Sequence, residues 1–255
     1  MTVKIKTREI QYTAADGTQL FGYFAAPESD TAIAGVLVAP EWWGRNEYTE
    51  QRARELAEQG YAAFALDMYG DKKVTTDAKQ AYEWMMQTFD HADTIVTRAS
   101  AALNTLVQQK EVNADKLAAI GFCYGGKVVL DLARSGAALK AVVTFHATLA
   151  TATPAQTGQV QAEILVQHGE LDSMVSLEDV ATFRNEMDAA QVKYQINIFE
   201  GAKHGFSNPM ADERAKANGV DLAYNATAEQ QSLAAMYALL ARQLGSKALR
   251  TNTNI

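Results

Sequence analysis

Short apolar runs alternate with amphipathic segments along most of this chain, and this alternation constrains its fold more than any other feature of the sequence. The runs are typical of buried strands and cover residues 33–39, 61–66, 117–122, 139–145, 164–167 and 194–199. The amphipathic segments are typical of helices, most clearly at residues 48–59, 91–109, 124–134 and 227–244. Strands that alternate with helices predict an α/β fold with a mostly parallel, doubly wound sheet flanked by helices.

Two further strands are expected before the first helix. Residues 3–12 alternate between polar and apolar side chains, and residues 19–25 follow a turn signal. Between residues 70 and 90 bulky apolar groups favour a helix that covers the core over a wall that covers substrate. No linker or repeat divides the chain, so we expect one domain over residues 1–245 and a frayed tail over residues 246–255.

Charge and cysteine content exclude several classes of function. The net charge is −7 and no Lys/Arg cluster occurs, which argues against nucleic acid or a membrane surface as the main partner. The N-terminus lacks the apolar core of a signal peptide, and the longest apolar stretch, residues 32–40, is too short to span a bilayer. The single cysteine excludes an intramolecular disulfide and a zinc site built on paired thiolates. We therefore expect a cytoplasmic protein, a monomer or small homo-oligomer, with a small-molecule partner and no metal.

The hexapeptide Gly121-Phe122-Cys123-Tyr124-Gly125-Gly126 follows a buried strand and opens a helix, which is the context of a nucleophile elbow. A sharp turn of this kind brings backbone segments close together, and only small flanking residues permit it. The helix that follows directs unpaired N–H groups at the nucleophile, which favours a thiolate and can stabilise an oxyanion. A cysteine elsewhere is more often a small buried hydrophobe, but this setting favours a nucleophile.

A thiol nucleophile needs a base, and the chain has four histidines. His204 lies in a loop after the last strand, between glycines that suit a tight loop around a functional side chain. His146 and His168 each end an apolar strand, so either could lie beside the site at the C-terminal edge of the sheet. His91 precedes a charged helix and is expected on the surface.

A carboxylate should orient the imidazole. Asp172 follows the strand at 164–167 and gives the chain order nucleophile, acid, histidine. Glu170 is the competing acid, and Asp172 could instead cap the helix near Leu177.

Glu41 is an acid in an unusual place, because it ends a buried strand and precedes Trp42 and Trp43. One interpretation is a partly exposed acid at a strand end. If Glu41 instead meets Cys123, its charge would disfavour a permanent thiolate and gate the nucleophile.

Together these motifs resemble the dienelactone hydrolase family of the α/β-hydrolase fold. The similarity covers nearly the whole chain through the segments at residues 40–44, 66–70, 121–126, 168–172 and 202–206. The resemblance implies that Cys123 is the nucleophile, that His204 is the general base and then the acid, and that Asp172 holds His204. We thus expect a single-domain α/β-hydrolase.

The resemblance also implies roles around the thiol. The backbone N–H groups of Trp42 and Tyr124 would form the oxyanion hole, and Glu41 would move when substrate arrives. Members of the family hydrolyse dienelactones to maleylacetate-type acids without a metal or organic cofactor, so no cofactor is expected. The aromatic residues around these motifs suggest an aromatic-lined pocket and comprise Trp42, Trp43, Tyr124 and Phe206.

This sequence departs from the family where substrate is bound. Family members that act on dienelactone hold the substrate carboxylate with two arginines, one shortly after the catalytic histidine and one shortly before a tyrosine that Tyr82 matches. The corresponding positions here are Asn208 and Ala78. Point charges that could substitute are Lys79, Lys203 and Arg45, without the same bidentate geometry.

The function expected from the sequence is cysteine-dependent hydrolysis of a small carboxylic ester or lactone through a thioester acyl-enzyme. The missing arginines favour, as an alternative, a broad carboxylesterase. A non-catalytic small-molecule binding protein on the same fold is an alternative from another class. A thiol redox sensor is disfavoured, since no second cysteine can resolve a sulfenic acid.

Overall fold

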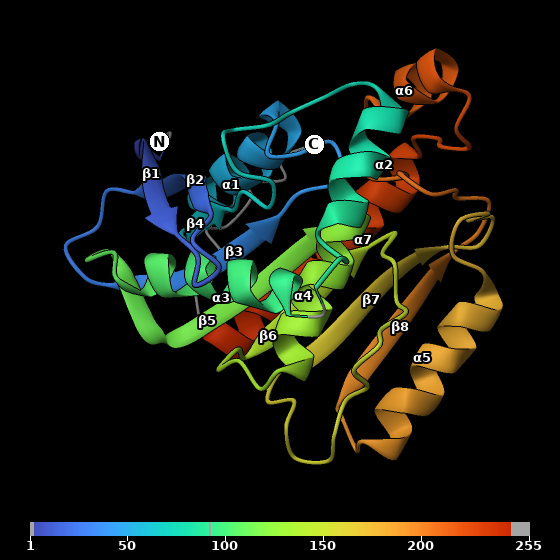
Figure 1. The fold of residues 1–255 in the computed structure, drawn as a ribbon. Coiled ribbons are helices and arrows are strands. Elements are labelled where there is room, and N and C mark those ends of the chain that lie inside the picture. Colours follow the sequence, from blue (N-terminus) through green and yellow to red (C-terminus); the bar gives the residue numbers. More distant parts are fainter. Residues whose placement is uncertain (1–2, 92, 246–255) are drawn as a thin grey trace, which may run out of the picture.

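Eight strands form one sheet in the order β1-β2-β4-β3-β5-β6-β7-β8 in a computed structural model that describes residues 3–91 and 93–245 (Figure 1). The strands are β1 (Ile5–Thr13), β2 (Gln19–Pro27), β3 (Ile33–Ala39), β4 (Ala62–Ala65), β5 (Val112–Phe122), β6 (Ala141–Phe145), β7 (Glu163–Gly169) and β8 (Tyr194–Phe199). The helices are α1 (Glu47–Glu58), α2 (Ala78–Gln87), α3 (Thr94–Val107), α4 (Tyr124–Arg134), α5 (Leu177–Ala189), α6 (Ala211–Asn218) and α7 (Ala226–Leu244). The expected tail, residues 246–255, lies outside the described residues.

The sheet is mostly parallel, as the sequence predicts. β1 pairs antiparallel with β2, and β2 pairs antiparallel with β4. From β4 through β3 to β8 every neighbouring pair is parallel. The carboxyl ends of β3, β5, β6 and β7 therefore meet at one edge, where open α/β sheets bind their ligands.

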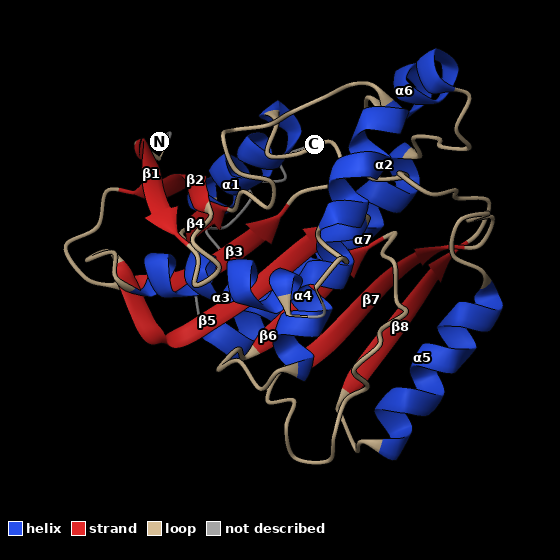
Figure 2. Ribbon diagram, viewed as in Figure 1, coloured by secondary structure: helices blue, strands red, loops and turns tan. Residues whose placement is uncertain are grey.

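Helices cover both faces of the sheet (Figure 2). Alternate residues of β3 show the division, because Val36 and Val38 face the core that α1 and α7 close, whereas Leu37 faces the core that α3, α4 and α5 close. This two-sided burial explains why the central strands are apolar throughout instead of alternating. The described residues form a single α/β domain.

Two elements differ from the expected pattern. β5 begins at Val112, five residues before the apolar run, because Val112 pairs with Ile33 of β3. The register between the two strands then shifts between Ala34 and Gly35. The sequence does not single out α6, whose eight residues bury only Ala211. The segment 70–90 contains the expected helix, α2, and Trp84 packs against the core from it.

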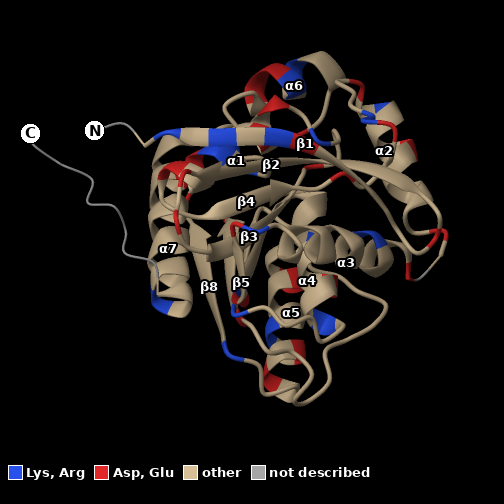
Figure 3. Cartoon of the chain, turned by 90° about the vertical axis from the view of Figure 1, so that its left-hand side faces the viewer, with Lys and Arg blue, Asp and Glu red and all other residues tan. Residues whose placement is uncertain are grey.

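The outer strand β1 has a basic rim (Figure 3). Lys4 and Lys6 both pair with Glu28, and Arg8 pairs with Glu111 at 2.9 Å. Charged side chains on an edge strand oppose pairing with a second sheet. None of the helices among the described residues is long and apolar enough to cross a membrane.

Candidate active site

Cys123 occupies a sharp turn between β5 and α4. Its backbone has φ 53° and ψ −117°, a conformation that costs energy for a residue with a Cβ. The turn is held by the end of β6, since the Cys123 N–H donates to Phe145 O at 2.9 Å. The thiol is neither fully buried nor fully exposed. The sharp strand-to-helix turn that the sequence predicts is therefore present, with Cys123 in a strained conformation.

Two glycines make room for this turn. A Cβ on Gly121 would lie 2.0 Å from the carbonyl oxygen of Gly125, and a Cβ on Gly125 would lie 2.3 Å from Ala39 O. Both neighbours are backbone atoms, so they cannot move aside as a flexible side chain would. The glycines fix the approach of β3 to the start of α4.

Two backbone N–H groups follow the carboxyl ends of β3 and β5 and form no hydrogen bond within the described residues. The N–H of Tyr124 opens α4, and the N–H of Trp42 lies in the turn after β3. Neither has a hydrogen-bond acceptor among the residues that the structure describes. Such N–H groups, together with the positive end of a helix dipole, suit an oxyanion.

His204 and Asp172 are joined at the carboxyl edge of the sheet. His204 Nδ1 lies 2.8 Å from Asp172 Oδ2, and both side chains are buried. Asp172 Oδ1 accepts from the N–H groups of Met174 and Val175, each at 2.9 Å. Burial opposes ionisation of Asp172, but the bond to His204 and these N–H groups hold its pKa below its usual value. The carboxylate is thus fixed and charged.

The other side of the His204 ring is directed toward sulfur. Nε2 is buried and has no hydrogen bond of normal geometry within the described chain. Burial would lower the pKa of His204, but the neighbouring Cys123 sulfur and Asp172 carboxylate outweigh it and raise the pKa to about 10. These two neighbours therefore favour the protonated form of the His204 ring.

Glu170 does not take part in this arrangement. Its carboxylate accepts from the Gly201 N–H at 3.0 Å and is exposed. The cap of α5 is Ser176, which forms a capping box with Asp179, so Asp172 is not the cap of that helix. Of the two acids that the sequence leaves open, Asp172 is the one bonded to His204.

Glu41 is buried and bonded to Asn208. The Asn208 amide donates to Glu41 Oε2 at 2.6 Å, while its Oδ1 accepts from the N–H of Met210 at the start of α6. Burial raises the pKa of Glu41, against the Asn208 bond and the charges of Arg214 and His204. In this structure the bonded partner of Glu41 is Asn208, not the thiol.

His146 packs behind His204. The ring centroids are 5.1 Å apart, and His146 Nε2 lies 2.9 Å from Ser207 Oγ. Burial and the charge of His204 lower the pKa of His146 well below its usual value. His168 is also buried, and burial lowers its pKa as well. Both rings therefore stay neutral beside the charged pair, and His91 is exposed as expected.

The neutral state of His146 makes stability depend on pH. Below pH 6.5 the ring takes up a proton in the unfolded chain but not in the fold, so the free energy of unfolding falls as the pH decreases. We expect the wild type to lose about 1 kcal/mol more than His146→Asn between pH 7 and pH 5.5. Urea unfolding of both proteins at both pH values measures this. His204 contributes to both proteins, so the difference reports His146, and equal pH dependence would contradict the expectation.

The expected aromatic residues are distributed between site and core. Trp42 keeps some exposed surface, and its carbonyl accepts from Tyr69 Oη at 3.0 Å. Phe206 is fully buried and packs on His146, so it contributes to the core and not to a pocket surface. Trp43 and Tyr124 are almost completely buried as well. Tyr82 is exposed on α2.

Two of the three cationic side chains that could hold a substrate carboxylate are paired with acidic side chains. Lys203 pairs with Asp221 at 2.7 Å. Arg45 is buried and pairs with Glu9 and Glu50. Lys79 is exposed at the first turn of α2.

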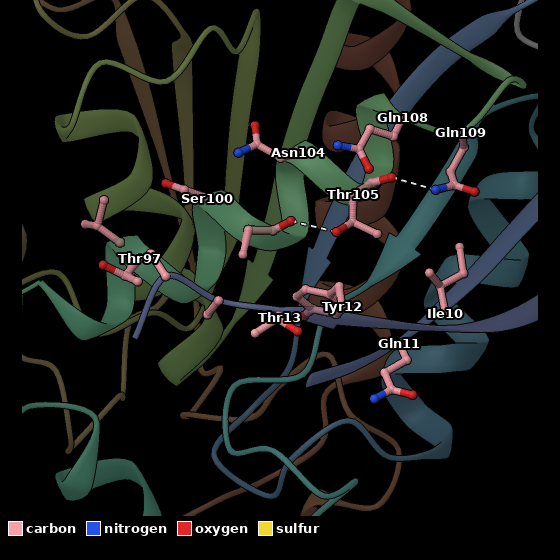
Figure 4. Close-up of a pocket in the computed structure, with 14 residues that line it drawn as sticks. Ile10, Gln11, Tyr12, Thr13, Thr97, Ser100, Asn104, Thr105, Gln108 and Gln109 are labelled. Atoms are coloured by element: carbon pink, nitrogen blue, oxygen red, sulfur yellow. Dashed lines mark hydrogen bonds between the residues drawn. The ribbon is translucent and has the colours of Figure 1, made fainter. Parts of the chain in front are cut away.

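A large open cavity lies away from this group of residues. It has a volume of about 760 Å³ and lies between β1 and α3, and Figure 4 shows hydroxyl and amide side chains such as Thr13, Asn104 and Gln108 around it. Several of these groups are already bonded, as where Gln109 Nε2 donates to Thr105 O at 2.7 Å. Across residues 3–91 and 93–245 no group of three or more His, Cys, Asp and Glu side chains is placed to hold a metal ion.

The sheet order and the elbow at the carboxyl end of β5 define the class of protein, an α/β hydrolase. The sequence model of the dienelactone hydrolase family matches residues 20–244. This chain belongs to the dienelactone hydrolase family, and it is a hydrolase of carboxylic esters or lactones.

Three similar proteins place the chain within this family. A solved structure described as a dienelactone hydrolase-like promiscuous phosphotriesterase from metagenomic libraries is 37% identical, with a TM-score of 0.87 over 94% of this chain and 99% of that one. A structure named m3DLH is 40% identical, with the same TM-score and coverage. A probable 2-oxo-3-(5-oxofuran-2-ylidene)propanoate lactonase of Bradyrhizobium sp is 27% identical over 207 residues, which are 77% of this chain and 83% of that protein.

Proposed function

We propose that the chain hydrolyses a small carboxylic ester or lactone through a thioester on Cys123. The observation that carries this proposal is the bond from His204 to Asp172, with the opposite edge of the ring beside the Cys123 sulfur at a strained elbow. In this arrangement Cys123 is the nucleophile, His204 moves the proton, and Asp172 orients the ring.

Acylation begins with attack of the Cys123 thiolate on the substrate carbonyl carbon. The carbonyl π electrons move to oxygen, and the N–H groups of Trp42 and Tyr124 stabilise the oxyanion. When the tetrahedral intermediate collapses, the carbon–oxygen bond to the leaving alkoxide breaks and the His204 imidazolium supplies its proton. In a lactone the released hydroxyl remains attached to the acyl group.

Deacylation uses the same residues in reverse order. Neutral His204 accepts a proton from water as the oxygen attacks the thioester carbon, and the carbon–sulfur bond then breaks. The product is a carboxylic acid, and Cys123 returns as a thiolate beside the imidazolium. Burial raises the pKa of Glu41, which opposes a negative charge on this acid.

Trapping the thioester tests this proposal. Quenching the wild type with acid during turnover of para-nitrophenyl acetate is expected to give a protein mass increased by one acetyl group, located on the peptide that contains Cys123. Hydroxylamine should remove it, because thioesters react with this nucleophile. An acetyl group on any other residue during burst turnover, or turnover with no adduct on Cys123 under single-turnover conditions, would contradict the proposed nucleophile.

Phosphotriester hydrolysis is a second candidate. The observation that favours it is the 37% identity to the structure described as a promiscuous phosphotriesterase, over 94% of this chain. A thiolate can attack phosphorus as well as a carbonyl carbon, and an oxyanion hole can stabilise negative charge on a phosphoryl oxygen as well as on a carbonyl oxygen. Turnover of diethyl para-nitrophenyl phosphate that is lost in Cys123→Ala would support this activity, and release of para-nitrophenol equal to the uncatalysed rate would exclude it.

A further inference from the structure

Tyr69 is a buried side chain that contacts both residues whose N–H groups would bind the oxyanion. Its hydroxyl donates to Trp42 O at 3.0 Å. Its ring stacks on that of Tyr124, with the centroids 6.1 Å apart and the planes at 15°. Tyr69 therefore links the turn after β3 to the start of α4, although the proposed mechanism gives it no part.

Trp42 lies in the middle of a four-residue turn. The Gly44 N–H donates to Glu41 O at 3.3 Å, so Trp42 and Trp43 occupy the two central positions. The middle peptide of such a turn can take two opposite orientations, which distinguish turn types I and II. No backbone N–H of the described residues donates to the Trp42 carbonyl, and the Tyr69 hydroxyl does. This bond limits rotation of the residue that carries the N–H.

The backbone of Tyr69 is itself fixed. Asp67 is buried just after β4, and its Oδ1 accepts from the N–H of Tyr69 at 2.9 Å and from that of Gly70 at 3.1 Å. Burial raises the pKa of Tyr69, and the charges of Cys123 and Asp67 add to this effect. At neutral pH the hydroxyl therefore keeps its proton and can donate it to Trp42 O.

The side chain of Tyr124 is held at its far end as well. The Thr88 hydroxyl donates to Met85 O at 2.6 Å, and Tyr124 Oη lies 2.7 Å from the same Thr88 oxygen. Since the Thr88 proton is already used, Tyr124 is the donor in the second bond. Tyr124 is thus fixed between Thr88 and the ring of Tyr69.

We propose that Tyr69 is a positioning residue for the oxyanion hole, whose hydroxyl holds Trp42 and whose ring holds Tyr124 before substrate arrives. This inference rests on the proposed function, which supplies the oxyanion. Tyr69 acts through these two residues and not on the reacting atoms. Donors that are already in place stabilise developing charge without reorganisation during the reaction, whereas donors that must first reorient lose part of that gain.

An ester and its thionoester distinguish this role from a purely structural one. Wild type and Tyr69→Phe are compared on para-nitrophenyl benzoate and on O-para-nitrophenyl thiobenzoate, in which sulfur replaces the carbonyl oxygen. In both substrates attack by the Cys123 thiolate breaks the bond from carbon to the para-nitrophenolate oxygen, and a thioester or a dithioester remains on the enzyme. Release of para-nitrophenolate with enzyme in excess therefore measures acylation alone. Sulfur accepts hydrogen bonds more weakly than oxygen, so the N–H groups contribute less to the thionoester reaction.

We expect Tyr69→Phe to lower the acylation rate constant of the ester about five- to thirtyfold, a fraction of the cost of losing an oxyanion donor. The dissociation constant of the ester should change by less than about twofold, because the ring and its packing remain. The thionoester should lose less than about threefold in acylation rate, so the ratio of ester to thionoester rates falls. Equal losses on both substrates would assign Tyr69 a structural role and overturn the inference, as would an unchanged ester rate.

Tyr12→Phe is the matched control. Tyr12 is also buried, and its hydroxyl donates to a main-chain oxygen, Asp67 O, at 3.2 Å. The ratio of the two rates should stay within about twofold of the wild type, since this bond involves neither residue of the oxyanion hole. The same fall in both variants would overturn the assignment to Tyr69. If Cys123→Ala releases para-nitrophenolate as fast as the wild type, the proposed function fails whatever the ratio is.

Discussion

Cys123→Ala is expected to lower kcat for ester hydrolysis by about four to six orders of magnitude, because no acyl-enzyme can form without the sulfur. The oxyanion hole and the binding surface remain, so the residual rate should stay above that of the uncatalysed reaction. Stopped-flow or single-turnover assays with para-nitrophenyl acetate measure the loss. The alanine variant keeps a Cβ at the strained turn, so its melting temperature and circular dichroism should match the wild type.

Binding to the same variant separates the enzyme from a ligand-holding protein. If Cys123→Ala binds substrate as tightly as the wild type while turnover disappears, the thiol acts in chemistry and not in binding. A variant that retains more than a tenth of wild-type kcat would contradict the thioester mechanism. Undetectable wild-type turnover together with tight ligand binding would favour the non-catalytic alternative.

Asp172→Asn is expected to lower kcat by about three to four orders of magnitude, the second largest effect. The carboxylate accepts from His204 Nδ1 and is one of the groups that raise the pKa of this ring. An amide at this position can present its NH2 group to Nδ1, which favours the wrong tautomer, and it no longer stabilises the imidazolium. The pKa of His204 should then fall. In a pH–rate profile of kcat/KM, the decline that reports loss of the imidazolium proton should therefore occur at lower pH than in the wild type.

Glu170→Gln is the matched control for this experiment. It removes one negative charge two residues away, from a carboxylate that bonds to the Gly201 N–H instead of the imidazole. Its kcat should stay within about twofold of the wild type. Similar losses in Asp172→Asn and Glu170→Gln would mean that the local negative charge matters and that the specific bond to His204 does not.

Much of the fold is predictable from the sequence because its central strands are buried on both faces. β3 and β8 begin and end at the expected residues, and α4 does so as well, since each is bounded by clear turn residues. The start of β5 is not predictable, because residues 113–116 are mostly polar. Val112 and Asn113 pair with β3, while residues 114–116 fall in the register shift between Ala34 and Gly35. Strand pairing depends on the fold as a whole and leaves no local signal.

Part of the candidate site is also predictable from the sequence, and part of it is not. Cys123, Asp172 and His204 follow strands, and strand ends are visible in the sequence. The choice of Asp172 over Glu170 needs the path of the loop, which brings only the first of them to the ring. The bond between Asn208 and Glu41 gives no signal, because it joins residues far apart in the chain.

The glycines around the elbow have a consequence for how this chemistry can diverge. A larger residue at position 121 or 125 must displace the backbone of another segment, whereas a new side chain at position 123 replaces one group on a frame that is already built. Exchange of the attacking atom is therefore a single-residue change, while alteration of the turn requires several changes at once. Among related sequences we expect the glycines of this turn to be preserved where the nucleophile varies, so the same fold can support either thiol or hydroxyl chemistry.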